Sequence, residues 1–161
     1  MTSTITRSQA DTSGAGSSHR VHEPALNSVL TWLIAGRSEH SPWRVVAAAA
    51  AIGEAVAHIP VTKEHLTEAP YIGIAFVLVT VAGFVLAQLL LTADTRRLWQ
   101  ATAVVSALAL VAFLLSRTIG LPQIQDDIGD WSDPLGTVAV VCEAIMLATA
   151  IVHLSTHRSR Q

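Results

Sequence analysis

Four long apolar stretches separated by short polar segments dominate the hydrophobic pattern of the chain. They cover residues 45–61, 70–91, 98–116 and 134–154. A bilayer core is about 30 Å thick and needs roughly 20 helical residues to cross it, which the last three stretches supply. The first stretch is shorter, rich in alanine and interrupted by Glu54 and His58, but we interpret it as a span too. The pattern predicts an all-α membrane protein with a four-transmembrane-helix bundle at residues 45–154.

The residues outside the four stretches divide into three parts. Residues 1–22 are rich in Ser and Thr and poor in apolar side chains, which is typical of a disordered tail. Residues 23–44 carry apolar side chains at helical spacing between Pro24 and Gly36, which suit a helix start and a helix end. This pattern predicts a short amphipathic helix at the membrane interface, followed by a linker. Residues 155–161 form a second tail.

Composition excludes several classes of protein. The chain is 51% hydrophobic and only 14% charged, whereas soluble domains carry about 25% charged residues. The polar segments are too short for a catalytic domain with its own core, so we expect a non-enzymatic protein. The single cysteine, Cys142, excludes a disulfide within the chain and the cysteine pair of a thiol oxidoreductase. The sequence has no basic stripe or Gly-rich phosphate loop, so we expect no nucleic-acid partner.

Basic side chains are distributed unevenly between the two sides of the predicted bundle. With four spans, one side receives Arg7, Arg20, Arg37, Arg44, Arg96, Arg97, Arg158 and Arg160, while the other receives only Lys63 and Arg117. Cytoplasmic loops carry an excess of Lys and Arg, so both termini are predicted to be cytoplasmic. Trp43 and Trp99 fall at the inner ends of spans, where aromatic anchors are expected. The preference for Arg over Lys suggests a GC-rich bacterial genome, and hence the bacterial plasma membrane.

Three ionisable side chains fall within the predicted spans: Glu54, His58 and Glu143. Such residues are costly in a bilayer and are candidate functional groups by default. Glu54 and Glu143 each lie one residue outward of the centre of their span, so their carboxyl groups should be level. Two such acids in close contact should share one proton or together bind a cation. The predicted site is therefore a proton or cation site formed by these three residues, although two neutral acids that hydrogen-bond across helices are a structural alternative.

The outer loops contain a second set of candidates. His65 and Glu68 are three residues apart, a spacing that can direct both side chains to one metal ion on a helical turn capped by Thr62. With His58 below and Asp126, Asp127, Asp130 or Asp133 above, a divalent-metal site is conceivable, but a solvated acidic loop is the simpler interpretation. Arg117 either reaches the interface or pairs with an outer carboxylate such as Glu68. Asp133 before Pro134 suits a helix N-cap.

A haem site is not expected. His58 lies near the outer side and His153 at the inner end, so the two cannot ligate one haem. We expect His153 and His157 to be solvated.

The same residues carry a resemblance to a group of known proteins. The pattern is His58, His65 and Glu68, then Gly73 and Phe76, then Arg-Thr-Ile-Gly-Leu-Pro at residues 117–122, then an acidic loop and Glu143. It resembles small uncharacterised four-span integral membrane proteins of actinobacteria and related bacteria. The resemblance covers roughly residues 45–154. It implies a four-span fold with the histidine and glutamate cluster toward the outer face, and it implies no reaction.

Three functions follow from these patterns. The first is a small polytopic membrane protein that binds a proton, metal ion or small partner inside the bundle, as an accessory or transport subunit. The second is a small proton-coupled exporter, because small multidrug-resistance transporters also combine four short helices with a glutamate in the first span; their aromatic motifs are lacking here. The third is a metal-bearing membrane redox subunit that uses His58, His65 and Glu68. The expected partners are the lipid bilayer and a second copy or a membrane complex.

Overall fold

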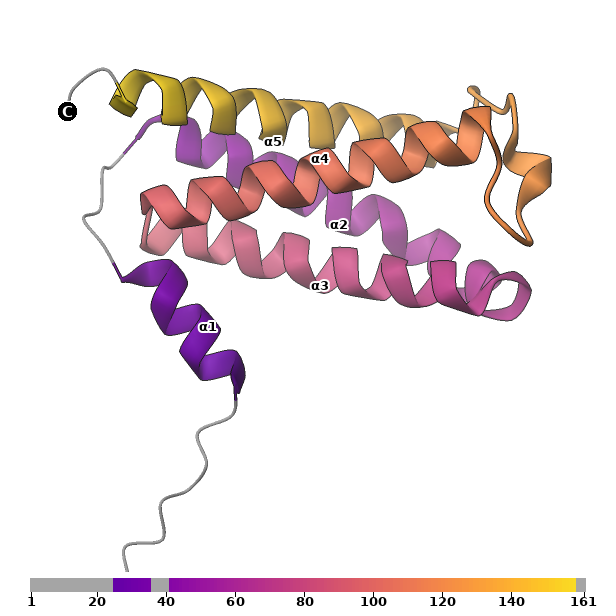
Figure 1. The fold of residues 1–161 in the computed structure, drawn as a ribbon, viewed down its shortest axis with the longest axis horizontal. Coiled ribbons are helices and arrows are strands. Elements are labelled where there is room, and N and C mark those ends of the chain that lie inside the picture. Colours follow the sequence, from indigo (N-terminus) through magenta and orange to yellow (C-terminus); the bar gives the residue numbers. More distant parts are fainter. Residues whose placement is uncertain (1–24, 36–40, 159–161) are drawn as a thin grey trace, which may run out of the picture.

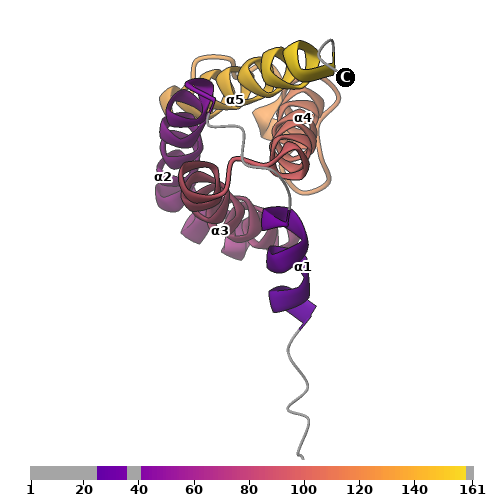
Figure 2. The ribbon, with the colours of Figure 1, turned by 90° about the vertical axis from the view of Figure 1, so that its left-hand side faces the viewer.

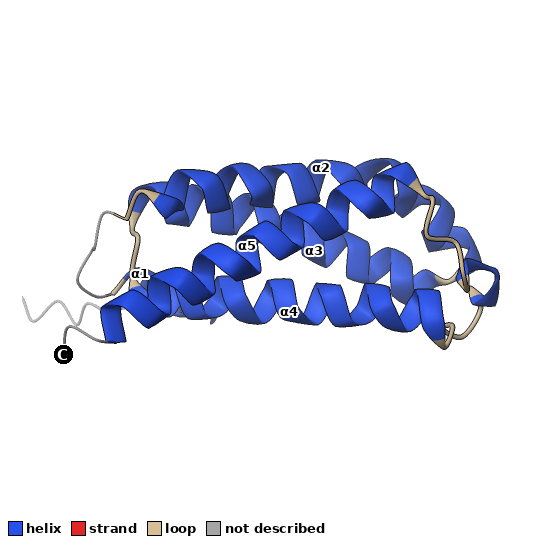
Figure 3. Ribbon diagram, turned by 90° about the horizontal axis from the view of Figure 1, so that it is seen from above, coloured by secondary structure: helices blue, strands red, loops and turns tan. Residues whose placement is uncertain are grey.

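In the computed structural model, residues 25–35 and 41–158 are described. In chain order, the helices of this part are α1 (Ala25–Ile34), α2 (Trp43–Glu68), α3 (Pro70–Thr92), α4 (Arg96–Thr118), the short 3-10 helix η1 (Gln125–Asp127) and α5 (Pro134–Arg158). Apart from a single bridge between Leu121 and Ile124, this part of the chain has no β-pairing (Figure 3). The predicted all-α fold is confirmed.

The four long helices form an up-and-down bundle (Figure 1). Helix α2 packs against α3 and α5, and α4 packs mainly against α5, so the helices form a ring when viewed along the bundle (Figure 2). One end of the bundle holds the start of α2, the α3–α4 turn and the end of α5, and we name it the terminal end. The other holds the α2–α3 junction and the segment 119–133, and we name it the loop end.

All four long helices have the length and composition of membrane spans. The candidate spans are Trp43–Glu68, Pro70–Thr92, Arg96–Thr118 and Pro134–Thr156, of 26, 23, 23 and 23 residues. Large apolar side chains such as Leu78 and Leu108 stand on the outside of the bundle with about two thirds of their surface exposed, at 64% and 65%. An apolar exterior of this kind fits lipid rather than water. These features are those of a small multi-pass membrane protein.

Helix α2 is longer than the apolar pattern predicts. The segment 62–69 was expected to be a loop, but α2 continues to Glu68 and only Ala69 leaves the helical conformation. The helix continues through Pro60, although its ring removes one backbone donor and crowds the carbonyl of Val56, and Thr62 donates its hydroxyl to the His58 carbonyl at 2.6 Å. Thr62 therefore does not cap a separate turn. Ala69 is extended because a proline follows it, and Pro70 then begins α3.

The alanines of α2 form the centre of the terminal half of the bundle. Ala47, Ala51 and Ala55 are fully buried, and a Cβ at Gly83 of α3 would lie 2.9 Å from the Ala51 carbonyl oxygen. Small residues at such contacts let helix backbones approach closely. The alanine-rich composition that weakens the hydrophobic pattern of the first span is therefore its packing surface. Leu90, Leu98 and other apolar side chains fill the rest of this core.

The terminal end is closed around Asp94 in the α3–α4 turn. This fully buried carboxylate accepts hydrogen bonds from the Ser41 amide at 2.5 Å and from Trp99 Nε1 at 2.6 Å. Trp99 was predicted to be an interface anchor and His153 to be solvated, and both predictions are wrong. Both residues are buried, and their rings stack at 4.4 Å between centroids. The two positions face each other between α4 and α5, where a flat imidazole fits the face of an indole.

Helix α1 confirms the short N-terminal helix and lies beside the terminal end (Figure 1). Arg97 donates to the carbonyls of Trp32 and Ala35, and its guanidinium lies 4.9 Å from the centroid of the Trp32 ring. A cation at the C-terminal carbonyls stabilises a helix end. The apolar side chains of α1, including Leu26 and Val29, are exposed. Its position at the membrane interface stays a prediction, and the tail predicted for 1–22 lies outside the described residues.

Candidate functional site

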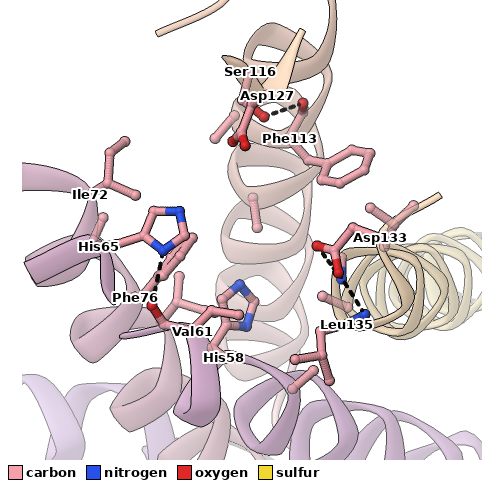
Figure 4. Close-up of a pocket in the computed structure, with 18 of the residues that line it drawn as sticks. His58, Val61, His65, Ile72, Phe76, Phe113, Ser116, Asp127, Asp133 and Leu135 are labelled. Carbon is pink, nitrogen blue, oxygen red and sulfur yellow. Dashed lines mark hydrogen bonds between the residues drawn. The ribbon is translucent and has the colours of Figure 1, made fainter. Parts of the chain in front are cut away.

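A cavity of about 220 Å³ lies in the loop half of the bundle. It is surrounded by residues of α2, α3, α4, α5 and the segment 119–133 (Figure 4). Of the residues singled out from the sequence, those that line it are His58, His65, Phe76, Arg117, Asp127, Asp130, Asp133 and Glu143. Glu54 is buried but does not line it, and Glu68 is exposed at the end of α2.

The walls of the cavity are mainly apolar. Phe76 of α3 and Phe113 of α4 contribute aromatic rings, and Ala57, Val61, Ala109, Leu135 and Ala139 are among the aliphatic residues around them. The small side chains on α2, α4 and α5 leave the space open, because an alanine fills less volume than the leucines of the terminal half. An apolar cavity with a few polar groups is the usual form of a small-molecule site.

His58 and His65 lie two turns apart on one face of α2, and both rings point into the cavity (Figure 4). Nδ1 of His58 lies 2.9 Å from the Glu54 carbonyl, and Nδ1 of His65 lies 2.9 Å from the Val61 carbonyl. Because a carbonyl only accepts, each Nδ1 carries the proton, and Nε2 of the neutral ring is an acceptor. Phe76 contacts both imidazoles, with ring centroids 4.9 Å and 4.8 Å apart.

Glu143 forms the deepest polar point of the cavity. Its side chain is 3% exposed, and its Oε2 has no hydrogen-bond partner. Behind it lies Glu54 of α2, which is fully buried with both carboxyl oxygens unpartnered. The helix contact fixes this level, because a Cβ at Gly53 would lie 2.8 Å from the sulfur of Cys142. Because the two helices are antiparallel, Glu54 lies one residue from this contact toward the loop end and Glu143 one residue toward the terminal end, so the two positions are about 3 Å apart along the bundle axis.

This pair of acids determines what the site can do chemically. Glu54 and Glu143 are both buried, and they belong to α2 and α5, which pack against each other. Buried polar atoms without partners are rare in proteins, and an unpaired charge in a low-dielectric interior is costly. The pair can lower this cost by holding a proton or by binding a cation that enters the cavity.

Arg117 organises the rim of the cavity at the loop end. It is 7% exposed, and it forms ion pairs with Asp127 at 3.0 Å and with Asp133 at 3.3 Å. The sequence left two possibilities, reaching the interface or pairing with an outer acid such as Glu68. The structure shows acid pairing, with Asp127 and Asp133 instead of Glu68. Asp130 also lines the cavity, so the three aspartates against one arginine give the rim a formal charge of −2.

Several contacts shape the segment that carries this rim. Asp133 caps α5, as predicted, by accepting from the amides of Leu135 and Gly136, both at 3.0 Å. Gly136 must be small, because a Cβ there would lie 2.8 Å from the carboxylate of Asp133. The Tyr71 hydroxyl donates to the Pro122 carbonyl and ties the segment to α3. Gly120 has a φ of +82°, a conformation that favours glycine.

The proposed metal ligands do not gather in one place. Within residues 25–35 and 41–158, no group of three or more His, Cys, Asp and Glu side chains has an arrangement that holds a metal ion. His58 and His65 stand on either side of Phe76, and Glu68 is exposed and outside the cavity. The site lining is thus better suited to a proton or an organic group than to a metal.

Some residues of the site were not singled out by the sequence reasoning. Nothing in the sequence around Phe113 distinguishes it from the other apolar residues of its span. The contact of Gly53 with Cys142 was also missed, although both residues directly precede the two predicted acids. The glycine next to a predicted intramembrane acid is the one sequence feature that could have indicated this close helix contact.

Comparison of the chain with protein-family models, with curated proteins and with solved structures finds no match. The cavity and the residues that line it are the features of the molecule that indicate a function.

Proposed function

We propose that this protein binds a proton or a small cation at Glu143 and exchanges it with the solution at the loop end through the cavity. The observation that carries the proposal is a buried carboxyl group with an unpartnered oxygen at the deepest point of a cavity. Glu54 lies behind it as a second acid, and His58 and His65 line the approach. The protein acts by binding and release, and the only bond that changes is the O–H bond of a protonated carboxyl group.

Charge placement supports an orientation for this exchange. Arg44, Arg96 and Arg97 lie at the terminal end, whereas the loop end carries Asp126, Asp127, Asp130, Asp133, Glu64 and Glu68 against Lys63 and Arg117. By the positive-inside rule the terminal end is cytoplasmic and the cavity faces outward. The resemblance to actinobacterial four-span proteins and the preference for arginine support a bacterial plasma membrane as the location of this arrangement. This assignment is part of the proposal.

A proton-coupled exporter is the second candidate, and the second acid favours it. With two buried carboxyl groups on the packed helices α2 and α5, one can hold a proton while the other holds a cationic cargo. The terminal half is closed by the packed core around Leu90, Leu98 and Trp99, so an exporter must also open this half. Loss of resistance to toxic cations in Glu54→Gln, expressed in a sensitised host, would favour export. Unchanged resistance would favour binding without transport.

Infrared difference spectroscopy of the purified protein tests the binding proposal. A protonated carboxyl group has its own absorption, and we expect this band to change as the pH is raised. Glu143→Gln should remove most of the change, because the amide cannot ionise. Glu64→Gln is the matched control, since Glu64 is exposed and outside the cavity. A pH-dependent spectrum that is the same in Glu143→Gln and the parent protein would overturn the proposal.

A further inference from the structure

We infer that the cavity binds a small organic monocation, such as an alkyl- or arylammonium ion, with its charge toward Glu143 and its apolar part against the wall. The inference rests on the proposed function, because it takes Glu143 as the ionisable group of the cavity. It adds the chemical class of the ligand. It is carried by three properties of the cavity: its charge, its lining and its size.

The charge of the cavity selects a cation. Its entrance carries Asp127, Asp130 and Asp133, and its deepest polar group is the Glu143 carboxyl. The guanidinium of Arg117 is already held by two carboxylates. The two imidazoles donate through Nδ1 to their own helix, and so present acceptors to the cavity. An anion would therefore meet mainly acids and acceptors, with the unpartnered Nε of Arg117 as a buried donor, whereas a cation is attracted from the rim to the floor.

The lining selects an organic cation over a hydrated metal ion. Ca²⁺ and Mg²⁺ need six or more oxygen ligands, which a wall of Val61, Phe76, Val79, Leu135 and Ala139 does not supply. An alkyl or aryl group buries its surface against the same wall and gains about 25 cal/mol per Å². The ring of Phe76 beside the two histidines adds an aromatic surface, which attracts an ammonium group at short range.

The size of the cavity limits the ligand. An apolar cavity of about 150 Å³ is large enough to hold benzene, so a cavity of about 220 Å³ holds one aromatic ring and a small ammonium head. Benzyltrimethylammonium has this form. It also keeps its charge at every pH, so any pH dependence of its binding reports on the protein.

Isothermal titration calorimetry of the full-length protein in detergent micelles tests this inference. The probes are benzyltrimethylammonium, benzyl alcohol as a neutral comparator and benzenesulfonate as an anion. We expect saturable binding of the cation alone, weakened at low pH because a proton on Glu143 removes the attraction. Glu143→Gln should weaken binding at least about tenfold. Benzenesulfonate binding as tight as the cation, or cation binding unchanged in Glu143→Gln, would overturn the inference.

A second set of variants tests the same binding site without changing Glu143, in case Glu143→Gln does not fold. Ala139 is 6% exposed and lines the cavity, so Ala139→Leu should fill the space and abolish binding. Asp130→Asn should weaken binding about two- to threefold at low ionic strength. Asp126→Asn is its matched control, because Asp126 is an exposed acid of the same segment and does not line the cavity. Equal binding in Ala139→Leu and the parent protein would place the ligand elsewhere and refute the inference.

The two proposals fail in different ways. If the infrared experiment shows a carboxyl group that titrates and depends on Glu143, but benzyltrimethylammonium does not bind, the ligand class is wrong and the proton site stands. If no carboxyl band depends on Glu143, both are wrong, because the cation then has no ionisable partner at the floor.

Discussion

Gly53 of α2 lies against the side chain of Cys142 of α5, where a Cβ on the glycine would be only 2.8 Å from the sulfur. Real Cβ atoms are not found this close to another heavy atom, so the contact is possible only because residue 53 has no side chain. It brings the two helices together beside Glu54 and Glu143, which lie on opposite sides of the contact along the bundle axis. The pair of acids is therefore positioned by its neighbours in the sequence as well as by its own burial.

The contact predicts the effect of adding one methyl group. Gly53→Ala should destabilise the protein by about 1–3 kcal/mol, because overpacking forces a shift of one helix. Cys142→Ala removes the sulfur and should restore most of this loss when the two changes are combined. Thermal unfolding followed by circular dichroism in detergent measures all four proteins of this cycle. Strictly additive effects would mean that the two residues are not in contact.

The ion pairs of Arg117 are expected to stabilise the rim of the cavity. Arg117→Lys keeps the charge but cannot hold Asp127 and Asp133 at once, because an ammonium group lacks the fork of the guanidinium. Since both aspartates are about one third exposed, at 29% and 31%, the loss should be modest, about 1–2 kcal/mol. Hydrogen exchange of residues 119–133 should become faster. Unchanged exchange there would show that the ion pairs do not hold the segment.

The buried carboxylate of Asp94 leads to an independent prediction about the stability of the terminal end. Asp94→Asn keeps the shape of the side chain but replaces one acceptor oxygen by an NH2 group, so only one of the bonds from the Ser41 amide and Trp99 Nε1 can form, at a cost of about 1–3 kcal/mol. With Trp32, Trp43 and Trp131 replaced by phenylalanine, fluorescence reports on Trp99 alone. We expect its emission to move to longer wavelength as water reaches the indole. An identical spectrum would contradict the role given to this carboxylate.

Orientation in the membrane is tested by labelling single cysteines in a Cys142→Ser background. Asp130 lies at the loop end and Ser155 is exposed at the terminal end. A maleimide that does not cross membranes should label Asp130→Cys in intact cells and Ser155→Cys only after lysis. The opposite pattern would turn the cavity toward the cytoplasm and contradict the proposed orientation.

The sequence predicted the spans well because each depends on a simple physical requirement. A long apolar stretch must be helical in lipid, and an acid inside it must turn toward the bundle, which is how Glu143 and Glu54 were found. Asp133 was predicted as a cap because capping depends only on near neighbours.

Other features could not be predicted because they depend on how distant segments meet. Trp99 and His153 are residue types that are common at membrane interfaces, but the antiparallel packing of α4 and α5 brings their rings face to face. The partners of Arg117 depend on how the segment 119–133 folds back over α4. The cavity depends on small side chains that coincide on separate helices, and a single sequence does not reveal such a coincidence.

The central claim is that Glu143 exchanges protons with the loop-end solution through the cavity. It is tested most directly by time-resolved infrared spectroscopy of oriented proteoliposomes after a pH jump confined to one side. We predict that the carboxyl band responds at once to a jump on the loop-end side, responds slowly to one on the terminal side, and is lost in Glu143→Gln. A band that responds equally from both sides, or only from the terminal side, would contradict the claim.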